Sequence, residues 1–221
     1  MFNLRAFYTK TGRAKYISHL DMNRCMDRAI KRSGLPVWYT EGFNPHIYTT
    51  FALPISLGFE SLCETMDFRL LEELPLEEVT ARLNACLPEG IRVLRTAPPL
   101  LKPEAITWAD YEVLLTFDRQ PAGEAARLLA AAYGREQLVV TKKTKRGQQE
   151  LDIKPLIQQF EAAPHDDENT VRLTVRLAAG IQTNINPMLL VEELCREAGL
   201  AYDYLQVLRR RVLTAGLTDF A

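Results

Sequence analysis

The sequence lacks the cysteine spacing and the long apolar runs that mark several common classes of protein. Its four cysteines are far apart, so none belongs to the closely spaced set that holds an iron–sulfur cluster or a structural zinc ion. No apolar run approaches the ~20 residues needed to cross a bilayer. We therefore expect a cytoplasmic protein with reduced thiols, no membrane contact, and no metal or other cofactor.

Common motifs for nucleotide binding and hydrolysis are also missing. The chain has no P-loop, no Gly-x-Gly-x-x-Gly opening a helix, no Gly-x-Ser-x-Gly and no His-Glu-x-x-His. Its 27 basic and 28 acidic side chains leave a net charge of -1, which does not favour nucleic acid over the whole chain. Any nucleic-acid surface must therefore come from local clusters of charge.

Hydrophobic periodicity predicts alternating strands and helices in the first hundred residues. Expected strands are residues 2–8, 47–53, 63–71 and 91–95. Ser18 and Asp21 have the spacing of a capping box, which predicts a helix from His19. The buried stripe of this helix is expected to hold Leu20, Cys25 or Met26, Ala29 and Ile30. A second helix is expected to begin at Pro75 and to stop at Gly90.

The proline-rich segment Ala97–Pro103 predicts a boundary between a domain of residues 1–97 and one of residues 104–221. The β-α-β-β-α-β order then recurs. Its expected parts are strands at 111–117, 170–177 and 204–208, helices at 121–133 and from Pro187 to Gly199, and a hairpin at 138–154. We predict an α+β fold of two tandem ferredoxin-like (split βαβ) modules.

Five segments of the N-terminal half carry a family resemblance: Tyr16–Asp21, Arg28–Pro36, Glu41–His46, Phe51–Gly58 and Glu64–Asp67. Through them the chain resembles the radical-SAM-linked family of bacterial proteins, a domain of unknown function. It departs from that pattern at Ile47, where the family often has proline, and at Tyr48, where a basic residue is common. The resemblance implies a radical-SAM protein as partner and a setting in RNA or ribosomal-protein modification, without an assigned reaction.

The first helix is expected to carry a basic face. Candidate RNA-binding residues in and before it are Arg13, Lys15, Arg24, Arg28, Lys31 and Arg32. The last four share one face, which could follow phosphates, while Phe43 and Asn44 on the next loop could contact bases. The alternative is a solvated helix face on which Asp27 pairs locally.

Two further basic clusters lie in the second half. The predicted hairpin tip contains Lys142, Lys143, Lys145 and Arg146, which could make salt-sensitive phosphate contacts or simply aid solubility. Arg209 and Arg211 are alternate residues of a predicted strand and are expected to point to the same face.

His19, His46 and Asp21 are the candidate catalytic residues, as a general acid–base group. The helix dipole disfavours protonation of His19 in the first helical turn. Histidines with a purely structural role are the alternative. Glu64 and Asp67 are expected on opposite faces of a strand, where one of them would hold an arginine of the first helix.

Three hypotheses for function remain open. The first is an accessory protein that presents or binds RNA or a ribonucleoprotein for a radical-SAM partner. The second is a protein-interaction partner without RNA contact, which docks through the exposed apolar segment Phe51–Phe59. The third is a stand-alone RNA-acting enzyme that uses His19 and His46.

Overall fold

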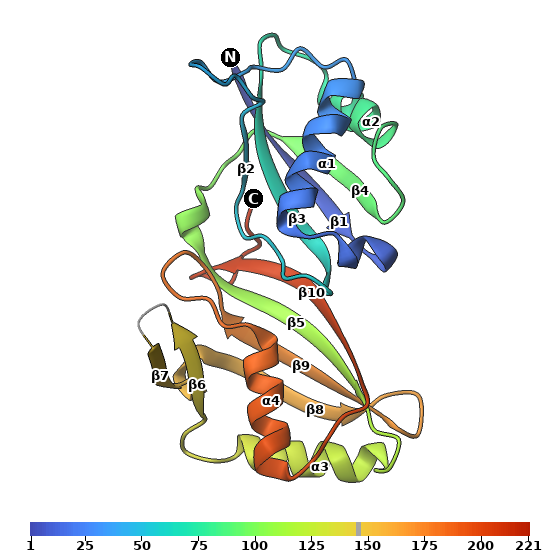
Figure 1. Ribbon diagram of the computed structural model, residues 1–221, viewed down its shortest axis with the longest axis vertical. Helices are drawn as coiled ribbons and strands as arrows, with labels where there is room; N and C mark the ends of the chain where they lie inside the picture. Colours follow the sequence, from blue (N-terminus) through green and yellow to red (C-terminus); the bar gives the residue numbers. More distant parts are fainter. Residues whose placement is uncertain (145–146) are drawn as a thin grey trace. The chain divides into compact units, whose positions relative to one another are not determined.

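The computed structural model describes residues 1–144 and 147–221, and the side chains of all of these except 142–144 and 147–149 (Figure 1). The chain divides into two compact units. Unit 1 comprises Met1–Ala105 with Phe220–Ala221, and unit 2 comprises Ile106–Asp219. Both combine helices with antiparallel strands, so the protein is α+β. Within the described residues, no helix is long and apolar enough to cross a membrane.

Unit 1 is a four-stranded antiparallel sheet with two helices. Its elements are β1 (Phe2–Lys10), η1 (Gly12–Tyr16), α1 (His19–Arg32), β2 (Thr49–Phe51), β3 (Glu60–Leu70), α2 (Leu76–Asn84), β4 (Ile91–Ala97) and η2 (Pro103–Ala105). The strand order is β4-β1-β3-β2. This order differs from the sequence order, because β1 lies between β3 and β4.

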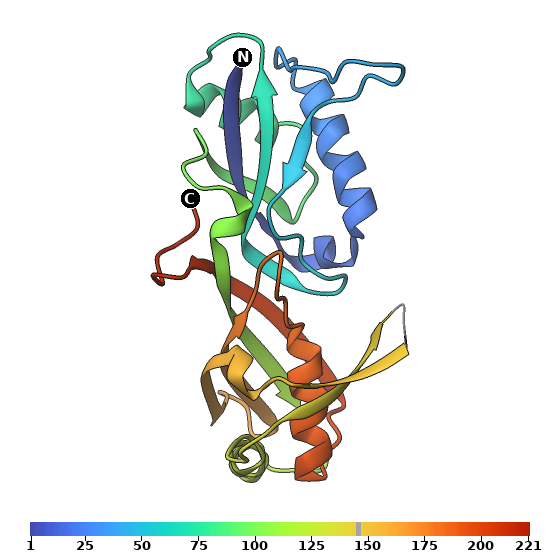
Figure 2. The ribbon, with the colours of Figure 1, turned by 90° about the vertical axis from the view of Figure 1, so that its left-hand side faces the viewer.

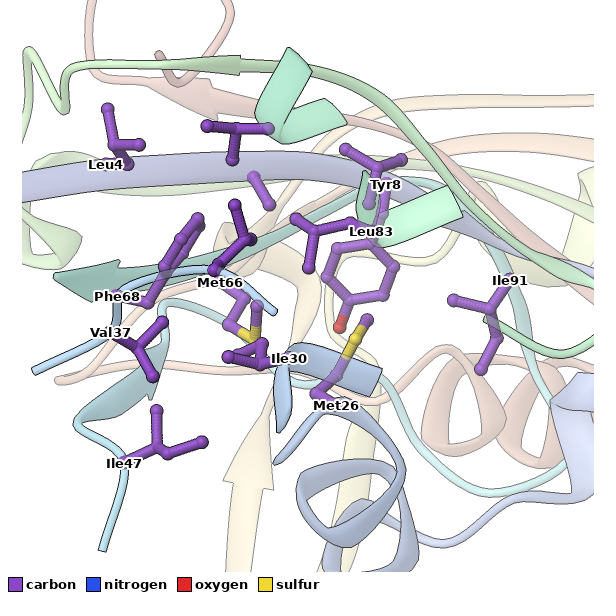
Figure 3. Close-up of a cluster of buried hydrophobic side chains, with 14 of the residues drawn as sticks. Leu4, Tyr8, Met26, Ile30, Val37, Ile47, Met66, Phe68, Leu83 and Ile91 are labelled. Carbon is purple, nitrogen blue, oxygen red and sulfur yellow. The ribbon is translucent and has the colours of Figure 1, made fainter. Parts of the chain in front are cut away.

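Both helices of unit 1 pack on the same face of this sheet. Met26 and Ile30 of α1 and Leu83 of α2 join Tyr8 of β1 and Phe68 of β3 in one buried cluster (Figure 3). Alternate residues of each strand enter this cluster, as the two-residue period of a strand requires. Each side chain of this size contributes about 1.5–3 kcal/mol when it is fully buried.

The Ser18 cap and the predicted start of α1 at His19 are confirmed, but one core residue of the helix is not as predicted. The Ser18 hydroxyl accepts a hydrogen bond from the backbone N–H of Asp21. The buried residues of α1 are Met22, Met26, Ala29 and Ile30. Leu20, expected in this stripe, is 59% exposed. Two residues correspond to about 200° of helix rotation, so Leu20 lies nearly opposite Met22.

Two other boundaries in unit 1 differ from those predicted. The β2 strand covers only Thr49–Phe51, and α2 ends at Asn84 rather than at Gly90. Gly90 instead begins the turn into β4 with a left-handed φ of +83°. A Cβ atom at this position would collide with the carbonyl oxygen of Thr11. Glycine is therefore required there for both conformation and space.

A buried ion pair joins β1 to β3 within unit 1. The Arg5 side chain is fully buried and donates two hydrogen bonds to the Asp67 carboxylate, at 2.6 and 2.8 Å. It also donates to the carbonyl oxygens of Leu101 and Ala221, and its guanidinium lies 4.4 Å from the Phe220 ring centroid. The prediction that an arginine of the first helix would fill this role is wrong.

Unit 2 is a second four-stranded antiparallel sheet with two helices and an added hairpin. Its elements are β5 (Ile106–Thr116), α3 (Ala122–Tyr133), β6 (Val139–Thr144), β7 (Gly147–Asp152), η3 (Lys154–Leu156), β8 (Ile157–Pro164), β9 (Thr170–Ala178), α4 (Pro187–Ala198) and β10 (Tyr204–Thr214). The strand order is β10-β5-β9-β8, and β6 pairs only with β7. This hairpin extends away from the sheet and helices of its unit (Figure 2).

The start and end signals of α4 are confirmed, whereas the sequence patterns missed β8. Asn186 accepts a hydrogen bond from the N–H of Met188, Pro187 opens the helix, and Gly199 ends it in the left-handed conformation. The β8 strand has no clean alternation of apolar and polar residues. It pairs with β9 at the outer edge of the sheet. All but one of its side chains are exposed or half-buried there, so apolar and polar residues need not alternate.

Candidate functional site

A groove on unit 1, here called the arginine groove, is lined by three arginines. It is lined by Asp21, Arg24, Cys25, Arg28, Arg32 and Pro88 and has a volume of about 340 Å³. Four residues of α-helix rise about 6 Å, so the Cα atoms of Arg24, Arg28 and Arg32 follow one another along α1 at that spacing, and all three residues are exposed. A chain of regularly spaced anions could follow this row.

The charges of this arginine groove are only partly compensated. Arg24 forms an exposed ion pair with Asp21 at 3.1 Å, and Arg32 donates a hydrogen bond to the carbonyl oxygen of Cys86. Arg28 is exposed and forms no ion pair with any residue that the structure describes. Three arginines thus face one carboxylate.

Two titratable groups of the arginine groove have shifted pKa values. The hydroxyl of Ser18 lowers the pKa of Asp21, and the neighbouring arginines lower it further. Asp21 is therefore ionised at neutral pH. Burial raises the pKa of the Cys25 thiol despite Arg28 and Arg32 nearby, so this cysteine is neutral there and is not an activated nucleophile.

The other basic residues predicted near α1 lie outside this groove. Lys31 is close enough to Asp27 to lower the pKa of that carboxyl, which burial raises overall. Arg13 and Lys15 belong to η1, before the helix, and the Lys15 ammonium lies 5.4 Å from the ring centroid of Tyr16. The four basic residues of α1 therefore do not all share one face as predicted. Arg24, Arg28 and Arg32 line the groove, whereas Lys31 lies near Asp27.

The loop of residues 41–46 presents one fully exposed aromatic ring. Phe43 is completely solvent-exposed, and Asn44 beside it is exposed too. Trp38 is less available for stacking because the Arg69 guanidinium lies 5.1 Å from its ring centroid and 4.2 Å from that of Tyr48. Phe43 is therefore more available to contact a base than Trp38 or Tyr48.

The candidate catalytic residues do not meet. The His19 ring lies 3.5 Å from the Asn23 amide and is nearly perpendicular to the Phe51 ring, with the ring centroids 5.4 Å apart. The Nδ1 atom of His46 lies 3.0 Å from the Thr40 hydroxyl and 3.1 Å from the carbonyl oxygen of Asn44.

These partners separate the three candidate catalytic side chains. His19 and His46 share no partner among the described residues, and Asp21 faces the arginine groove. In the part of the chain that the structure describes, these three side chains thus form no acid–base pair with one another. Within the same residues, no group of three or more His, Cys, Asp or Glu side chains could hold a metal ion.

One buried polar residue of unit 1, Lys10, was missed as a candidate by the sequence patterns, which had singled out Glu64 beside it. Lys10 and Glu64 are each 3% exposed and, with His19, line a very small cavity of about 10 Å³. Lys10 donates a hydrogen bond of 2.8 Å to the carbonyl oxygen of Ile17. The cavity has room for about one water molecule, so it does not admit a substrate. The sequence did contain a signal for the burial of Lys10. Alternate residues of β1 point to the core, so Tyr8 and Lys10 share its core face.

The paired-arginine prediction for unit 2 is wrong. Arg209 is 2% exposed, whereas Arg211 is exposed. A register shift in the pairing of β10 with β5 falls between these residues and breaks the two-residue alternation. Arg211 bonds to Asp219 at 2.8 Å and lies 4.0 Å from Asp110.

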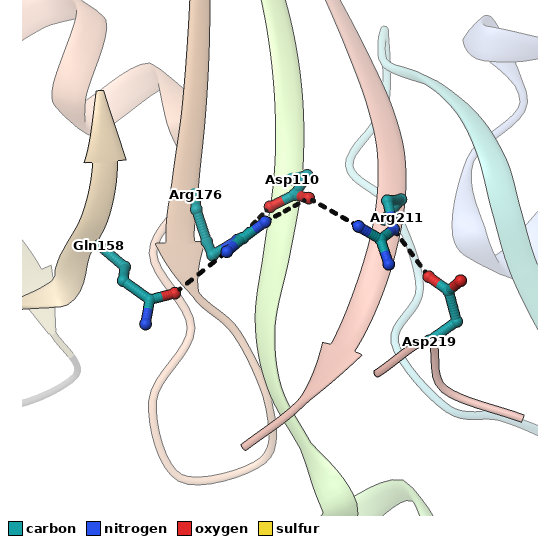
Figure 4. Close-up of polar contacts among 5 residues, drawn as sticks. All are labelled: Asp110, Gln158, Arg176, Arg211 and Asp219. Carbon is teal, nitrogen blue, oxygen red and sulfur yellow. Dashed lines mark hydrogen bonds and ion pairs between the residues drawn. The ribbon is translucent and has the colours of Figure 1, made fainter. Parts of the chain in front are cut away.

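The pairing of Arg211 is part of a polar row across the sheet of unit 2. Asp110 of β5 also accepts two hydrogen bonds from Arg176 of β9, so a single carboxylate lies between two arginines (Figure 4). Gln158 of β8 lies at the other end of the row, 3.4 Å from Arg176. Arg176 and Arg211 thus form ion pairs with carboxylates of the same unit.

The basic hairpin is described only in part. Lys142 and Lys143 belong to β6, which pairs with β7 as predicted for a hairpin. Lys145 and Arg146 lie outside the described residues. The proposed phosphate contacts of this tip therefore stay a prediction.

Comparisons with known proteins place the chain in a family without giving it an activity. None of the curated proteins matches the sequence significantly. A solved structure described as an unknown protein from Galdieria sulphuraria is 13% identical, with 93% of this chain and 95% of that chain covered and a TM-score of 0.28. A family model matches residues 3–187, which is most of the chain. The protein therefore belongs to the family described as "Uncharacterized protein conserved in bacteria (DUF2344)".

Proposed function

We propose that this protein is an accessory module that binds RNA, or RNA within a ribonucleoprotein, and presents it to a radical-SAM partner. The arginine groove is the single observation that carries the RNA part of the proposal. Arg24, Arg28 and Arg32 offer regularly spaced, exposed cations that match a chain of phosphates better than a compact anion. Phe43 supplies a stacking surface on the same unit.

The partner in this proposal follows from the sequence motifs. The segments Tyr16–Asp21, Glu41–His46 and Phe51–Gly58 resemble those of the radical-SAM-linked family. In the structure they form the start of α1, the loop with Phe43, and the stretch that follows β2. They all belong to unit 1, which supports this unit as the one that serves the partner.

We also infer that the two units are tandem ferredoxin-like modules. The supporting observation is their strand order. Numbered along each unit and without the β6–β7 hairpin, both antiparallel sheets have the order 4-1-3-2, with both crossover segments helical. Domain limits of 1–97 and 104–221 remain the corresponding prediction for the modules.

The test is RNA binding by full-length protein as a function of salt. Changing Arg24, Arg28 and Arg32 together to glutamine removes three cations. For single-stranded RNA, the slope of log K against log salt concentration should then fall by about 2, since each phosphate contact contributes about 0.7. A matched control changes the exposed Arg92, Arg119 and Arg127 to glutamine, with the same loss of charge. Equal slopes for both triple variants, or no binding by wild-type protein, would contradict the proposal.

A second experiment addresses the alternative of a protein partner without RNA contact. A tagged pull-down with and without RNase separates a protein complex that survives RNA removal from one that depends on RNA. The segment first considered for docking offers little apolar surface, because Ile55 and Phe59 are buried and Leu57 alone is a large exposed apolar side chain there. A partner surface is better sought elsewhere on unit 1.

A further inference from the structure

The N-terminal end of β1 has an open edge. On one side, β3 pairs with β1 along its length, from Phe2 opposite Leu70 onward. On the other side, the pairing with β4 begins only at Arg5, opposite Ala97. Residues 98 and 99 are both proline, and proline has no N–H with which to extend the ladder. Within the described part of the chain, Phe2–Leu4 thus have no strand on this side.

A mostly apolar groove of about 440 Å³ lies beside this edge. Leu4 and Leu70 are buried residues of its lining, and Phe2 and Leu76 are each 39% exposed. The volume is in the range of sites that bind small ligands or a few side chains. The groove therefore combines exposed backbone hydrogen-bonding groups with apolar contact surface.

The surroundings of this β1-edge groove are acidic. Glu73 is part of its lining, and Glu72 and Glu77 are exposed neighbours in sequence of its lining residues. No lysine or arginine side chain lines the groove, where the positive charge is the N-terminal ammonium of Met1. The acidic side chains disfavour nucleic acid and favour a positively charged peptide, in contrast to the arginine groove.

We propose that the β1-edge groove binds an extended, basic segment of a protein partner by strand addition. The segment pairs with the edge of Phe2–Leu4 that β4 leaves unpaired, beside Pro98 and Pro99 in the lining of the groove. Its alternate side chains point to one face, where apolar ones enter the groove beside Leu76. Lysine or arginine residues that flank them lie near Glu73. An edge of three residues spans about 10 Å, so the core of the segment is short.

The probe is a library of random nine-residue peptides displayed on phage and selected on the full-length protein. Enriched peptides should carry apolar residues at alternate positions and a net positive charge. A fluorescent consensus peptide is then titrated against wild type, Leu76→Arg and Glu73→Lys. Both changes introduce positive charge at the groove, so binding should weaken about tenfold, the effect of one well-placed interface residue.

The matched control is Leu94→Arg, because Leu94 is 55% exposed on β4 and lies outside this groove. It should bind like wild type, and peptide binding should slow amide exchange at Phe2–Leu4. In a Trp108→Phe background, native Trp38 fluorescence verifies that each variant is folded. Failure to enrich basic, alternating peptides, or equal losses in Leu94→Arg and Leu76→Arg, would overturn the proposal. A dimer of the chain that Leu76→Arg dissociates would also overturn it, because the occupant would be a second copy.

Discussion

Replacing Asp67 by alanine should strongly destabilise unit 1. The Arg5 guanidinium is fully buried, and two of its four hydrogen bonds go to the Asp67 carboxylate, at 2.6 and 2.8 Å. The substitution leaves only the carbonyl oxygens of Leu101 and Ala221 and the ring of Phe220 around a buried positive charge. Removing one partner of such a pair costs about 3–5 kcal/mol of unfolding free energy.

The destabilisation of unit 1 can be measured separately because each unit contains one tryptophan. Trp38 belongs to unit 1 and Trp108 to unit 2. In a Trp108→Phe background, Trp38 fluorescence during urea unfolding therefore reports on unit 1. With an m-value of about 1.5 kcal/mol per molar urea, a loss of about 3 kcal/mol lowers the midpoint by about 2 M.

The control for this measurement is Glu78→Ala. Glu78 pairs with Arg82 one turn along α2, and both side chains are exposed. Such pairs contribute about 0.3–0.5 kcal/mol, so the urea midpoint should hardly change. If Asp67→Ala also lowered the unfolding free energy by less than about 1 kcal/mol, the buried guanidinium would not depend on this carboxylate and the reasoning would fail.

Three smaller predictions concern the same unit. Ser18→Ala removes the side-chain cap of α1 and should cost about 1 kcal/mol in thermal unfolding; an unchanged Tm would argue against the cap. Gly90→Ala should cost at least about 1–3 kcal/mol in urea, because φ is +83° and the new Cβ meets the Thr11 carbonyl; wild-type stability would exclude this collision. Burial raises the pKa of Asp27 in the folded protein. The contribution of this carboxyl to the free energy of unfolding therefore falls as the pH rises from its unfolded-state pKa to its folded-state pKa. Asp27→Asn should therefore be more stable than wild type at pH 7 and gain little at pH 3, and an equal gain at both pH values would refute the shift.

Local sequence was sufficient for the ends of the helices. Ser18 was recognised as a cap because the group it bonds, the N–H of Asp21, is only three residues away. Asn186 and Gly199 were recognised for the same reason, since they bond or turn the backbone next to them. Interactions within one helical turn depend on neighbouring residues and little else, so they can be predicted from a single chain.

The arginine row of the candidate site was also visible in the sequence, through the four-residue spacing of Arg24, Arg28 and Arg32. The sequence did not reveal that Pro88 lines the groove with these arginines or that Lys31 lies near Asp27. It placed His19 and His46 on a helix and a loop as observed, without showing that each has its own set of partners.

Tertiary structure alone decided the partners of the buried charges. Arg5 and Asp67 are 62 residues apart and meet because β1 and β3 pair in a register that places them opposite each other. A register shift in β10, invisible in the alternation of the sequence, separates the environments of Arg209 and Arg211. The sequence by itself determined which segments become helices and most of the strands. Strand register and helix rotation, which depend on packing across the whole unit, determined which side chains meet.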